Sequence, residues 1–236
     1  MNKFLVEKSP PLRGNVRISG AKNSALPILA ASLLGTEDII LEDVPQLKDV
    51  EVMCEVLSSL GAKVEFLDKG VIKINSKDIN NYETPYELMS KMRASFLVMG
   101  PLLTRLGKTK TSLPGGCAIG TRPIDLHLKG FRALGAEIDV DHGYIGAYAD
   151  KLVGDRIYLD FPSVGATENI MMAAVMAEGE TIIDNAAMEP EIVDLANFLN
   201  KMGAQIKGVG TSSIKIIGVK ELGGATHSII PDRIEA

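Results

Sequence analysis

An internal repeat limits what this chain can fold into more than any other feature of its sequence. The segment Leu60-Gly61-Ala62-Lys63-Val64 recurs as Leu134-Gly135-Ala136-Glu137-Ile138 and as Met202-Gly203-Ala204-Gln205-Ile206. Each copy ends a segment with apolar residues at helical intervals, in residues 50–60, 124–134 and 192–202. Glycine at this position suits a left-handed cap at the end of a helix, and a strand can begin directly after it.

The sequence around each copy also repeats in a constant order. A mostly apolar helix and then a β-rich run precede each copy, in residues 24–34 and 38–42, 89–103 and 108–112, and 167–176 and 180–184. A short turn and a second strand follow it, as at Asp68-Lys69-Gly70 before residues 71–74. Each unit therefore reads as βαβαββ, and three units fill the chain from about residue 14 to residue 220.

The helices of these units are apolar over much of their surface, so we expect them to pack inside with sheets around them. Three units that close on themselves predict one compact α/β domain. A break at residues 221–224 follows the third unit, and a strand-like run at 227–230 follows the break. The chain then stops at residues 231–236 without a helix cap or a polar tail, which indicates a sequence that has been cut short.

Composition and charge argue against several classes of protein. The longest stretch without a charged side chain, from Asn23 to Thr36, is shorter than the roughly 20 apolar residues that span a membrane. The N-terminus carries no secretory signal, so we expect a cytoplasmic protein with no membrane partner. A formal net charge of −5 disfavours nonspecific nucleic-acid binding. The three histidines are scattered and no CxxC pair occurs, so we expect no metal site.

The segment from Ser112 to Pro123 carries the residues best suited to chemistry. It places three glycines, the thiol of Cys117 and the cation of Arg122 between a predicted strand and a predicted helix. Such a loop exposes backbone amides, and Pro123 suits the first turn of a helix whose N-terminus favours an anion. Arg122 adds a charge with the fork geometry that phosphate and carboxylate groups require.

The two cysteines lie in different settings, and each thiol is therefore interpreted separately. A polarised, accessible thiol at Cys117 is typical of a reactive cysteine, and the alternative is a structural cysteine in a rigid turn. Cys54 lies mid-helix among apolar residues, which predicts an inert core thiol.

Three further segments could contact an anionic ligand. Lys22 and Asn23 follow a glycine turn at the predicted start of a helix, where the alternative is a solvated lysine beside an ordinary cap. The small residues Ser163, Val164 and Gly165 occupy the equivalent junction of the third unit and allow close approach to the backbone. Arg93 interrupts an apolar helix, either as an anion contact or as a surface residue. His127 has no companion at a triad spacing, which favours a packing role over a catalytic base.

Taken together, these segments resemble the UDP-N-acetylglucosamine enolpyruvyl transferases over essentially the whole chain. The run from Pro114 to His127 is the most specific match. The other matching segments are residues 19–23, 91–95, 163–167, 189–194 and 231–235.

The resemblance implies transfer of an enolpyruvyl group from phosphoenolpyruvate to the 3-hydroxyl of UDP-N-acetylglucosamine, with release of phosphate and without a cofactor. It also implies an inside-out α/β barrel built from three repeated βαβαββ units, with helices inside and sheets outside, at residues 20–220. Residues 1–19 and 221–236 would then belong to a second, truncated domain. Family members are roughly twice this length, so this chain corresponds to the N-terminal part and lacks the C-terminal half as a partner.

The resemblance also assigns roles to residues. Cys117 is implied as the general acid and as the thiol that fosfomycin alkylates, and Lys22 and Arg122 as the phosphoenolpyruvate contacts with Asn23 beside them. Phe161 stands where some relatives carry a lysine, so the resemblance does not carry over the diphosphate contact of that lysine. The implied contacts to the nucleotide sugar are Arg93, Arg122, Pro123, Ile124, Asp125, Leu126, Ser163, Val164 and Gly165.

The resemblance places the carboxylate base in the absent C-terminal half, so we expect this chain alone to be weakly active or inactive. One alternative is an enzyme like 3-phosphoshikimate 1-carboxyvinyltransferase, which shares the fold and the donor. A second is a non-catalytic fragment that binds a nucleotide sugar. A third, from another class, is an RNA-processing enzyme on a similar repeated unit, which predicts a basic stripe and salt-sensitive RNA binding.

Overall fold

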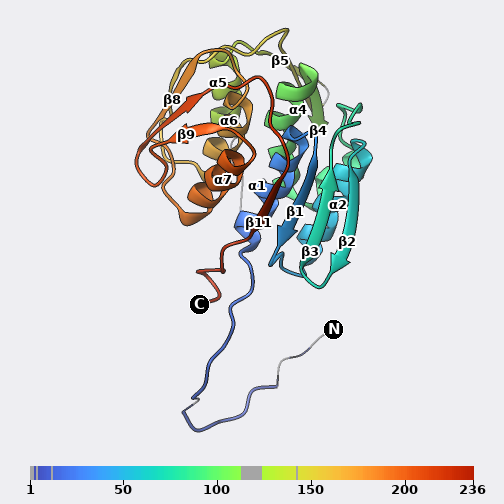
Figure 1. The fold of residues 1–236 in the computed structure, drawn as a ribbon, viewed down its shortest axis with the longest axis vertical. Coiled ribbons are helices and arrows are strands. Elements are labelled where there is room, and N and C mark those ends of the chain that lie inside the picture. Colours follow the sequence, from blue (N-terminus) through green and yellow to red (C-terminus); the bar gives the residue numbers. More distant parts are fainter. Residues whose placement is uncertain (1–2, 4, 12, 113–123, 142) are drawn as a thin grey trace.

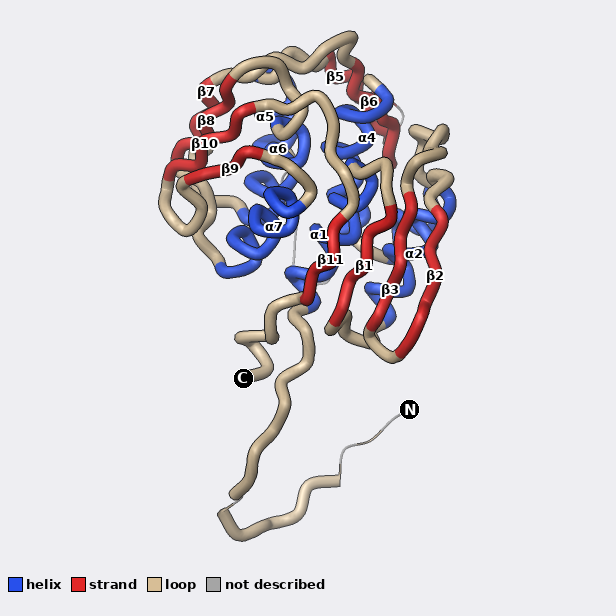
Figure 2. The backbone as a smooth tube through the Cα atoms, in the orientation of Figure 1, coloured by secondary structure: helices blue, strands red, loops and turns tan. Residues whose placement is uncertain are grey.

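The structure is a computed structural model that describes residues 3, 5–11, 13–112, 124–141 and 143–236. Its described strands form three separate sheets that lie around a group of helices (Figures 1 and 2). The described residues before Ser19 lead away from this body as an extended segment (Figure 1). None of the described helices is long and apolar enough to cross a bilayer.

The first unit supplies the first buried helix and most of the first sheet. Its elements are α1 (Lys22–Ala31), the 3-10 helix η1 (Ser32–Leu34), β1 (Asp38–Glu42), α2 (Lys48–Ser59), β2 (Lys63–Asp68) and β3 (Val71–Asn75).

The second unit has three short helical segments where the sequence predicts one helix over residues 89–103. Met92 is extended, with φ −146° and ψ 118°, and it separates the first segment from the second. Pro101 cannot continue a helix from its N-terminal side, but it fits the first turn of a new one. The elements are α3 (Tyr86–Lys91), η2 (Arg93–Val98), α4 (Met99–Leu106), β4 (Lys108–Ser112), α5 (Asp125–Ala133), β5 (Glu137–Asp141) and β6 (Tyr144–Tyr148).

The third unit follows the predicted order, and one more strand comes after it. Its elements are β7 (Arg156–Tyr158), α6 (Val164–Ala174), β8 (Glu180–Asp184), α7 (Pro190–Lys201), β9 (Gln205–Lys207) and β10 (Ser213–Ile217), with β11 (Ala225–Ser228) beyond them.

The sheets repeat one pairing pattern, which confirms the repeated unit. Each contains an antiparallel run, β1-β3-β2, β4-β6-β5 or β8-β10-β9. A parallel strand flanks two of these runs, β11 beside β1 and β7 beside β8. A single parallel bridge between Glu83 and Lys110 occupies the corresponding place in the second sheet.

The flanking strand of the first sheet is not the segment that the sequence predicts. The prediction starts the first unit at about residue 14, with a strand before α1. The structure uses β11 instead, and Ile39 to Glu42 pair in parallel with Ala225 to Ser228. Side-chain contacts of β11 with α7, described below, hold it there, and a pattern of neighbouring residues does not reveal such distant contacts. The division of the whole protein into two domains stays a prediction, but residues 225–228 lie in the sheet of the three-unit body.

The glycines of the repeat cap their helices as predicted. Gly61, Gly135 and Gly203 have φ of 102°, 94° and 112°, which favours glycine because a Cβ is strained there. The amide that follows each glycine donates to a carbonyl five residues back in the helix: Ala62 to Leu57, Ala136 to Phe131 and Ala204 to Leu199, at 3.1, 2.9 and 3.0 Å. These are Schellman-type closures.

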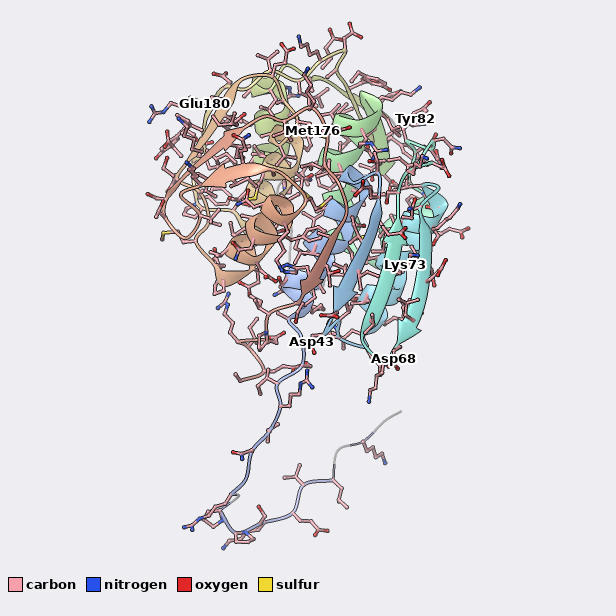
Figure 3. All side chains as sticks on the ribbon, viewed as in Figure 1. Asp43, Asp68, Lys73, Tyr82, Met176 and Glu180 are labelled. Atoms are coloured by element: carbon pink, nitrogen blue, oxygen red, sulfur yellow. The ribbon has the colours of Figure 1, made fainter. Side chains whose placement is uncertain are left out.

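Two helices, α1 and α6, lie inside, with sheets around them, as expected for the core of the domain. Residues Ser24–Ala31 of α1 and Ala166–Ala174 of α6 are all buried, so these helices face protein on every side. Buried residues alternate with less buried ones along β3 and β8, and Lys73 and Glu180 stand on the outer faces of these strands (Figure 3). The described strands do not close into a barrel, because no strand pairing joins one sheet to the next.

Candidate functional site

Four helices of the described chain begin around one cavity of about 400 Å³. Asn23 is the second residue of α1, Ile124 precedes α5, Val164 opens α6 and Glu189 precedes α7. The N-terminal end of a helix carries partial positive charge and free N–H groups. At α1, α5 and α6 this arrangement suits an anionic ligand, whereas α7 begins with the acids Glu189 and Glu191. The residues that line the cavity are Asn23, Leu26, Pro27, Phe96, Leu97, Ile124, His127, Val164, Gly165, Glu168, Glu189, Glu191 and Arg233.

A larger hollow of about 1260 Å³ lies elsewhere and holds none of the predicted site residues. Loop residues such as Gly107, Asp150 and Gly179 line it. Because the predicted residues gather at the smaller cavity, we assign the candidate site to it, although the other hollow is larger.

The structure brings four predicted residues together at this cavity: Asn23, Ile124, Val164 and Gly165. They come from all three units, so the repeat itself produces the convergence. Pro27 lines the same cavity and has no N–H, so the carbonyl oxygen of Asn23 lacks its usual helical donor.

Four other predicted residues are placed beside the cavity or in the packing around it. Lys22 opens α1, and Asp125 opens α5 with an exposed side chain. Ser163 caps α6, where its Oγ accepts from the N–H of Ala166 at 3.4 Å. Leu126 is buried in the core.

The remaining predicted residues keep the status of predictions. Cys117, Arg122 and Pro123 lie outside the described residues, as does the side chain of Arg93, whose backbone opens η2. The segment that carries Cys117 starts after β4 and ends at Ile124, which lines the cavity.

Lys22 is held by a weak contact that a ligand could replace. Its Nζ lies 3.0 Å from Oδ2 of Asp49 on α2, and the two side chains are 42% and 39% exposed. Ion pairs this exposed contribute about 0–1 kcal/mol. Exchange of the Asp49 carboxylate for a ligand anion therefore costs little.

His127 is a fixed part of the cavity wall. Its Nδ1 lies 3.1 Å from Nδ2 of Asn169, and its ring packs edge-on against Phe96 at 5.1 Å. The side-chain amide of Asn169 is itself oriented, because Oδ1 accepts from the N–H of Gly100 at 2.8 Å and Nδ2 donates to the carbonyl of Phe96 at 3.1 Å. Nδ1 of His127 therefore accepts, and a neutral ring carries its proton on Nε2. Sequence reasoning gave His127 a packing role and did not foresee Asn169.

Sequence reasoning also did not foresee that three acids line the cavity together. Glu168 on α6 is 3% exposed, and Glu189 and Glu191 stand at the start of α7. Nε of Arg233 donates to Glu191 at 3.0 and 3.4 Å. Burial, and then the charges of Glu191 and Glu189, hold the pKa of Glu168 well above its usual range. Among the described residues, no group of three acidic, histidine or cysteine side chains is placed to hold a metal ion.

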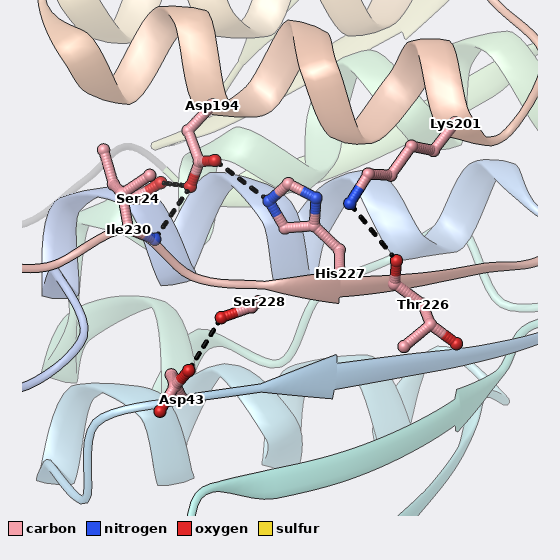
Figure 4. A network of polar contacts seen from close by, with 8 residues as sticks. All are labelled: Ser24, Asp43, Asp194, Lys201, Thr226, His227, Ser228 and Ile230. Carbon is pink, nitrogen blue, oxygen red and sulfur yellow. Dashed lines mark hydrogen bonds and ion pairs between the residues drawn. The ribbon is translucent and has the colours of Figure 1, made fainter.

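A buried network fixes the segment that delivers Arg233 to the cavity (Figure 4). Asp194 of α7 accepts from Ser24 Oγ at 2.5 Å and the N–H of Ile230 at 3.3 Å, and Oδ1 lies 2.9 Å from Nε2 of His227. Asp194 and His227 are each 4% exposed. The network therefore joins α1, α7 and β11 directly upstream of Arg233.

Cys54 behaves as the sequence predicts for a core thiol. It is buried in α2, and burial raises the pKa of its thiol to about 12, with smaller contributions from Glu51 and Glu55. A thiol this hard to ionise is a poor nucleophile.

The three repeated units and the cavity where their helices begin define an enolpyruvyl transferase fold. The family model for EPSP synthase (3-phosphoshikimate 1-carboxyvinyltransferase) matches residues 6–236, and the chain belongs to this family. Within it, the chain matches the N-terminal part of proteins named UDP-N-acetylglucosamine 1-carboxyvinyltransferase.

The relative from Finegoldia magna is 69% identical over 100% of this chain and 56% of its own length. The relative from Caldanaerobacter subterraneus subsp. tengcongensis is 69% identical over 99% of this chain and 56% of its own length. The chain thus spans a little over half the length of these relatives.

Solved structures agree on the fold. The enolpyruvyl transferase NikO from Streptomyces tendae has a TM-score of 0.84 at 21% identity, over 95% of this chain and 53% of that one. EPSP synthase from Acinetobacter baumannii has a TM-score of 0.72 at 18% identity, over 92% of this chain and 50% of that one. At these identities the likeness concerns the fold alone.

Proposed function

We propose that this chain is the N-terminal part of a cytoplasmic enzyme of peptidoglycan synthesis that transfers an enolpyruvyl group from phosphoenolpyruvate to the 3-hydroxyl of UDP-N-acetylglucosamine. The observation that carries the proposal is the convergence of Asn23, Ile124, Val164 and Gly165, from three units, on one cavity. The relatives named for this activity, 69% identical to the chain, support the choice of substrate.

The reaction needs a proton delivered to the methylene carbon of phosphoenolpyruvate and the loss of a proton from the sugar hydroxyl. A C–O bond forms to give a charged tetrahedral adduct, and phosphate then leaves as the double bond is restored with loss of a methyl proton. We assign the first proton to the thiol of Cys117. Preorganised cations and N–H groups stabilise such charge, and Lys22, Arg122 and the helix N-termini provide them.

The nucleotide sugar takes the other side of the proposed site. We assign its contacts to Arg93, to residues 122–126 and to Ser163, Val164 and Gly165, where a ligand can approach the N-terminus of α6. Phosphoenolpyruvate binds beside Asn23. The base and the remaining contacts belong to the C-terminal half, so we expect weak binding of the nucleotide sugar and little or no turnover by this chain alone.

Labelling with fosfomycin tests the assignment of the thiol. The chain is incubated with fosfomycin with and without UDP-N-acetylglucosamine, and intact mass and peptide masses are measured. We expect one adduct, on Cys117, that forms faster with the nucleotide sugar. Cys117→Ala should abolish the adduct and Cys54→Ala should leave it unchanged.

Two outcomes would contradict the proposal. Modification of Cys54 in place of Cys117 would reverse the assignment of the thiols. Phosphate release by the 236-residue chain at the rate of a complete enzyme would show that no C-terminal half is needed.

The second candidate is a 3-phosphoshikimate 1-carboxyvinyltransferase, which the description of the matching family model favours. Shikimate 3-phosphate and UDP-N-acetylglucosamine are then compared by calorimetric titration against the same chain. Preferential binding of shikimate 3-phosphate supports this candidate. Binding of the nucleotide sugar alone supports the proposed function.

A further inference from the structure

One carboxyl group in the cavity takes no part in the proposed mechanism and has an unpaired oxygen. Glu168 lines the cavity from α6 and is 3% exposed. Its Oε1 has no hydrogen-bond partner among the described residues. A buried acceptor left unpaired costs about 1–3 kcal/mol. Such a group is therefore expected to gain a partner when the cavity is filled.

The protonation of Glu168 decides which hydrogen bonds it can make. Burial and the nearby acids Glu191 and Glu189 keep the pKa of Glu168 well above its usual range, which favours the un-ionised form of this carboxyl group. An un-ionised carboxyl offers one O–H donor and one carbonyl acceptor. It can therefore donate to a ligand and accept from it at the same time.

The charges around Glu168 narrow the chemistry of its partner. Glu191 already holds Nε of Arg233, while Glu189 and Glu191 repel an anion at this end of the cavity. A phosphate group can only accept here, whereas hydroxyl and amide groups both donate and accept. The described acids also do not form a group that could hold a metal ion. A neutral, hydroxyl-bearing or amide-bearing ring therefore fits this end better than a phosphate or a metal ion.

We propose that Glu168 binds the sugar ring of the nucleotide sugar, donating its O–H to one ring substituent and accepting from another, and so contributes to the choice of sugar. The inference rests on the proposed function, because it takes UDP-N-acetylglucosamine as the ligand. The helix N-termini at Asn23 and Val164 lie on the same cavity, which at about 400 Å³ is within the usual range for a small-molecule site.

Calorimetric titration of the 236-residue chain with UDP-N-acetylglucosamine and with UDP tests the proposal. Glu168→Leu removes the donor and the acceptor, and we expect it to weaken binding of the nucleotide sugar about tenfold or more while UDP binds within about twofold of the unchanged chain. Glu168→Gln keeps a donor and an acceptor and should stay within about threefold for both ligands. Glu180→Gln, on the outer face of β8, is the matched control and should change neither affinity.

Each outcome separates the inference from the proposed function. If Glu168→Leu binds UDP-N-acetylglucosamine as tightly as the unchanged chain, or weakens UDP equally, the role of Glu168 is wrong and the proposed function stands. If the unchanged chain binds neither ligand, the proposed function fails and the inference with it.

Infrared difference spectroscopy gives a second measurement that does not depend on the folding of the leucine variant. We expect UDP-N-acetylglucosamine to shift the carbonyl band of an un-ionised carboxylic acid in the unchanged chain, and that band to be missing in Glu168→Gln. UDP should leave the band in place. A band that does not respond to the nucleotide sugar would overturn the proposal.

Discussion

Glu168 makes the stability of the folded chain depend on pH in an unusual direction for an acid. Its pKa in the folded chain is raised, first by burial and then by Glu191 and Glu189, above its ordinary value of 4.5. Between these two pKa values the folded chain binds more protons than the unfolded chain, so the free energy of unfolding contributed by Glu168 falls as pH rises. We expect Glu168→Gln to raise the melting temperature at about pH 8 and to change it little at about pH 4.

Thermal unfolding at the two pH values checks this expectation. Glu180→Gln serves as the control because Glu180 is exposed and paired with Lys215 at 2.5 Å, so its effect should be small. An equal shift of the melting temperature by Glu168→Gln at both pH values would show that Glu168 is not held uncharged by folding.

Cys54 allows a second prediction at the scale of the residue. Because burial raises the pKa of its thiol to about 12, we expect no reaction with iodoacetamide at neutral pH in the folded chain. In denaturant the same thiol should react fully. Peptide masses measured after each treatment check this, and rapid labelling of Cys54 in the folded chain would contradict its placement in the core.

At the scale of elements, the Asp194 network holds β11 and α7 together. Asp194→Ala removes the acceptor of Ser24, Ile230 and His227, and leaves these groups unpaired in the interior. We expect the free energy of unfolding to fall by about 3 kcal/mol, with faster hydrogen exchange in residues 225–230. Chemical denaturation and exchange mass spectrometry measure the two effects.

Ser228→Ala, in β11, is the matched control for Asp194→Ala. Ser228 Oγ donates to Asp43 at 2.7 Å on the exposed side of β11 (Figure 4). Its loss should cost at most about 1 kcal/mol because water can replace the bond. Equal effects of the two substitutions would show that the buried network does not anchor the strand.

At the scale of the whole molecule, Arg105 ties the second unit to the first. Its Nη1 donates to the carbonyl oxygens of Leu33 and Gly35, both at 2.9 Å, and burial lowers the pKa of its guanidinium. Arg105→Met keeps much of the packing but leaves these carbonyls unpaired, so we expect a loss of about 2–3 kcal/mol.

The three units should still unfold together, because buried residues of all three form one hydrophobic cluster. Calorimetry should therefore show a single transition at a lower temperature for Arg105→Met, with Arg132→Met, exposed at the end of α5, as the neutral control. Separate transitions for the three units would contradict a shared core.

The sequence by itself determined the repeated unit, its helix caps and the positions where a ligand can approach. Gly61, Gly135 and Gly203 were predictable because a cap depends only on the residues beside it. Asn23, Val164 and Gly165 were predictable as neighbours because they stand at helix starts at equivalent points of the repeat. The role of Cys117 came from resemblance to a family, and it stays a prediction because the residue lies outside the described part of the chain.

Tertiary structure alone decided which distant groups share one environment. β11 completes the first sheet, although the residues around it in the sequence do not indicate this pairing. Glu168 shares the cavity with Glu189, Glu191 and Arg233, which lie at least 20 residues away in the sequence. Hydrogen bonds, burial and the interaction between charges depend on which groups are close in space. The packing of the three units brought these segments together. For that reason the sequence predicted where the helices begin, and only the folded chain showed a buried acid with a raised pKa in the wall of the cavity.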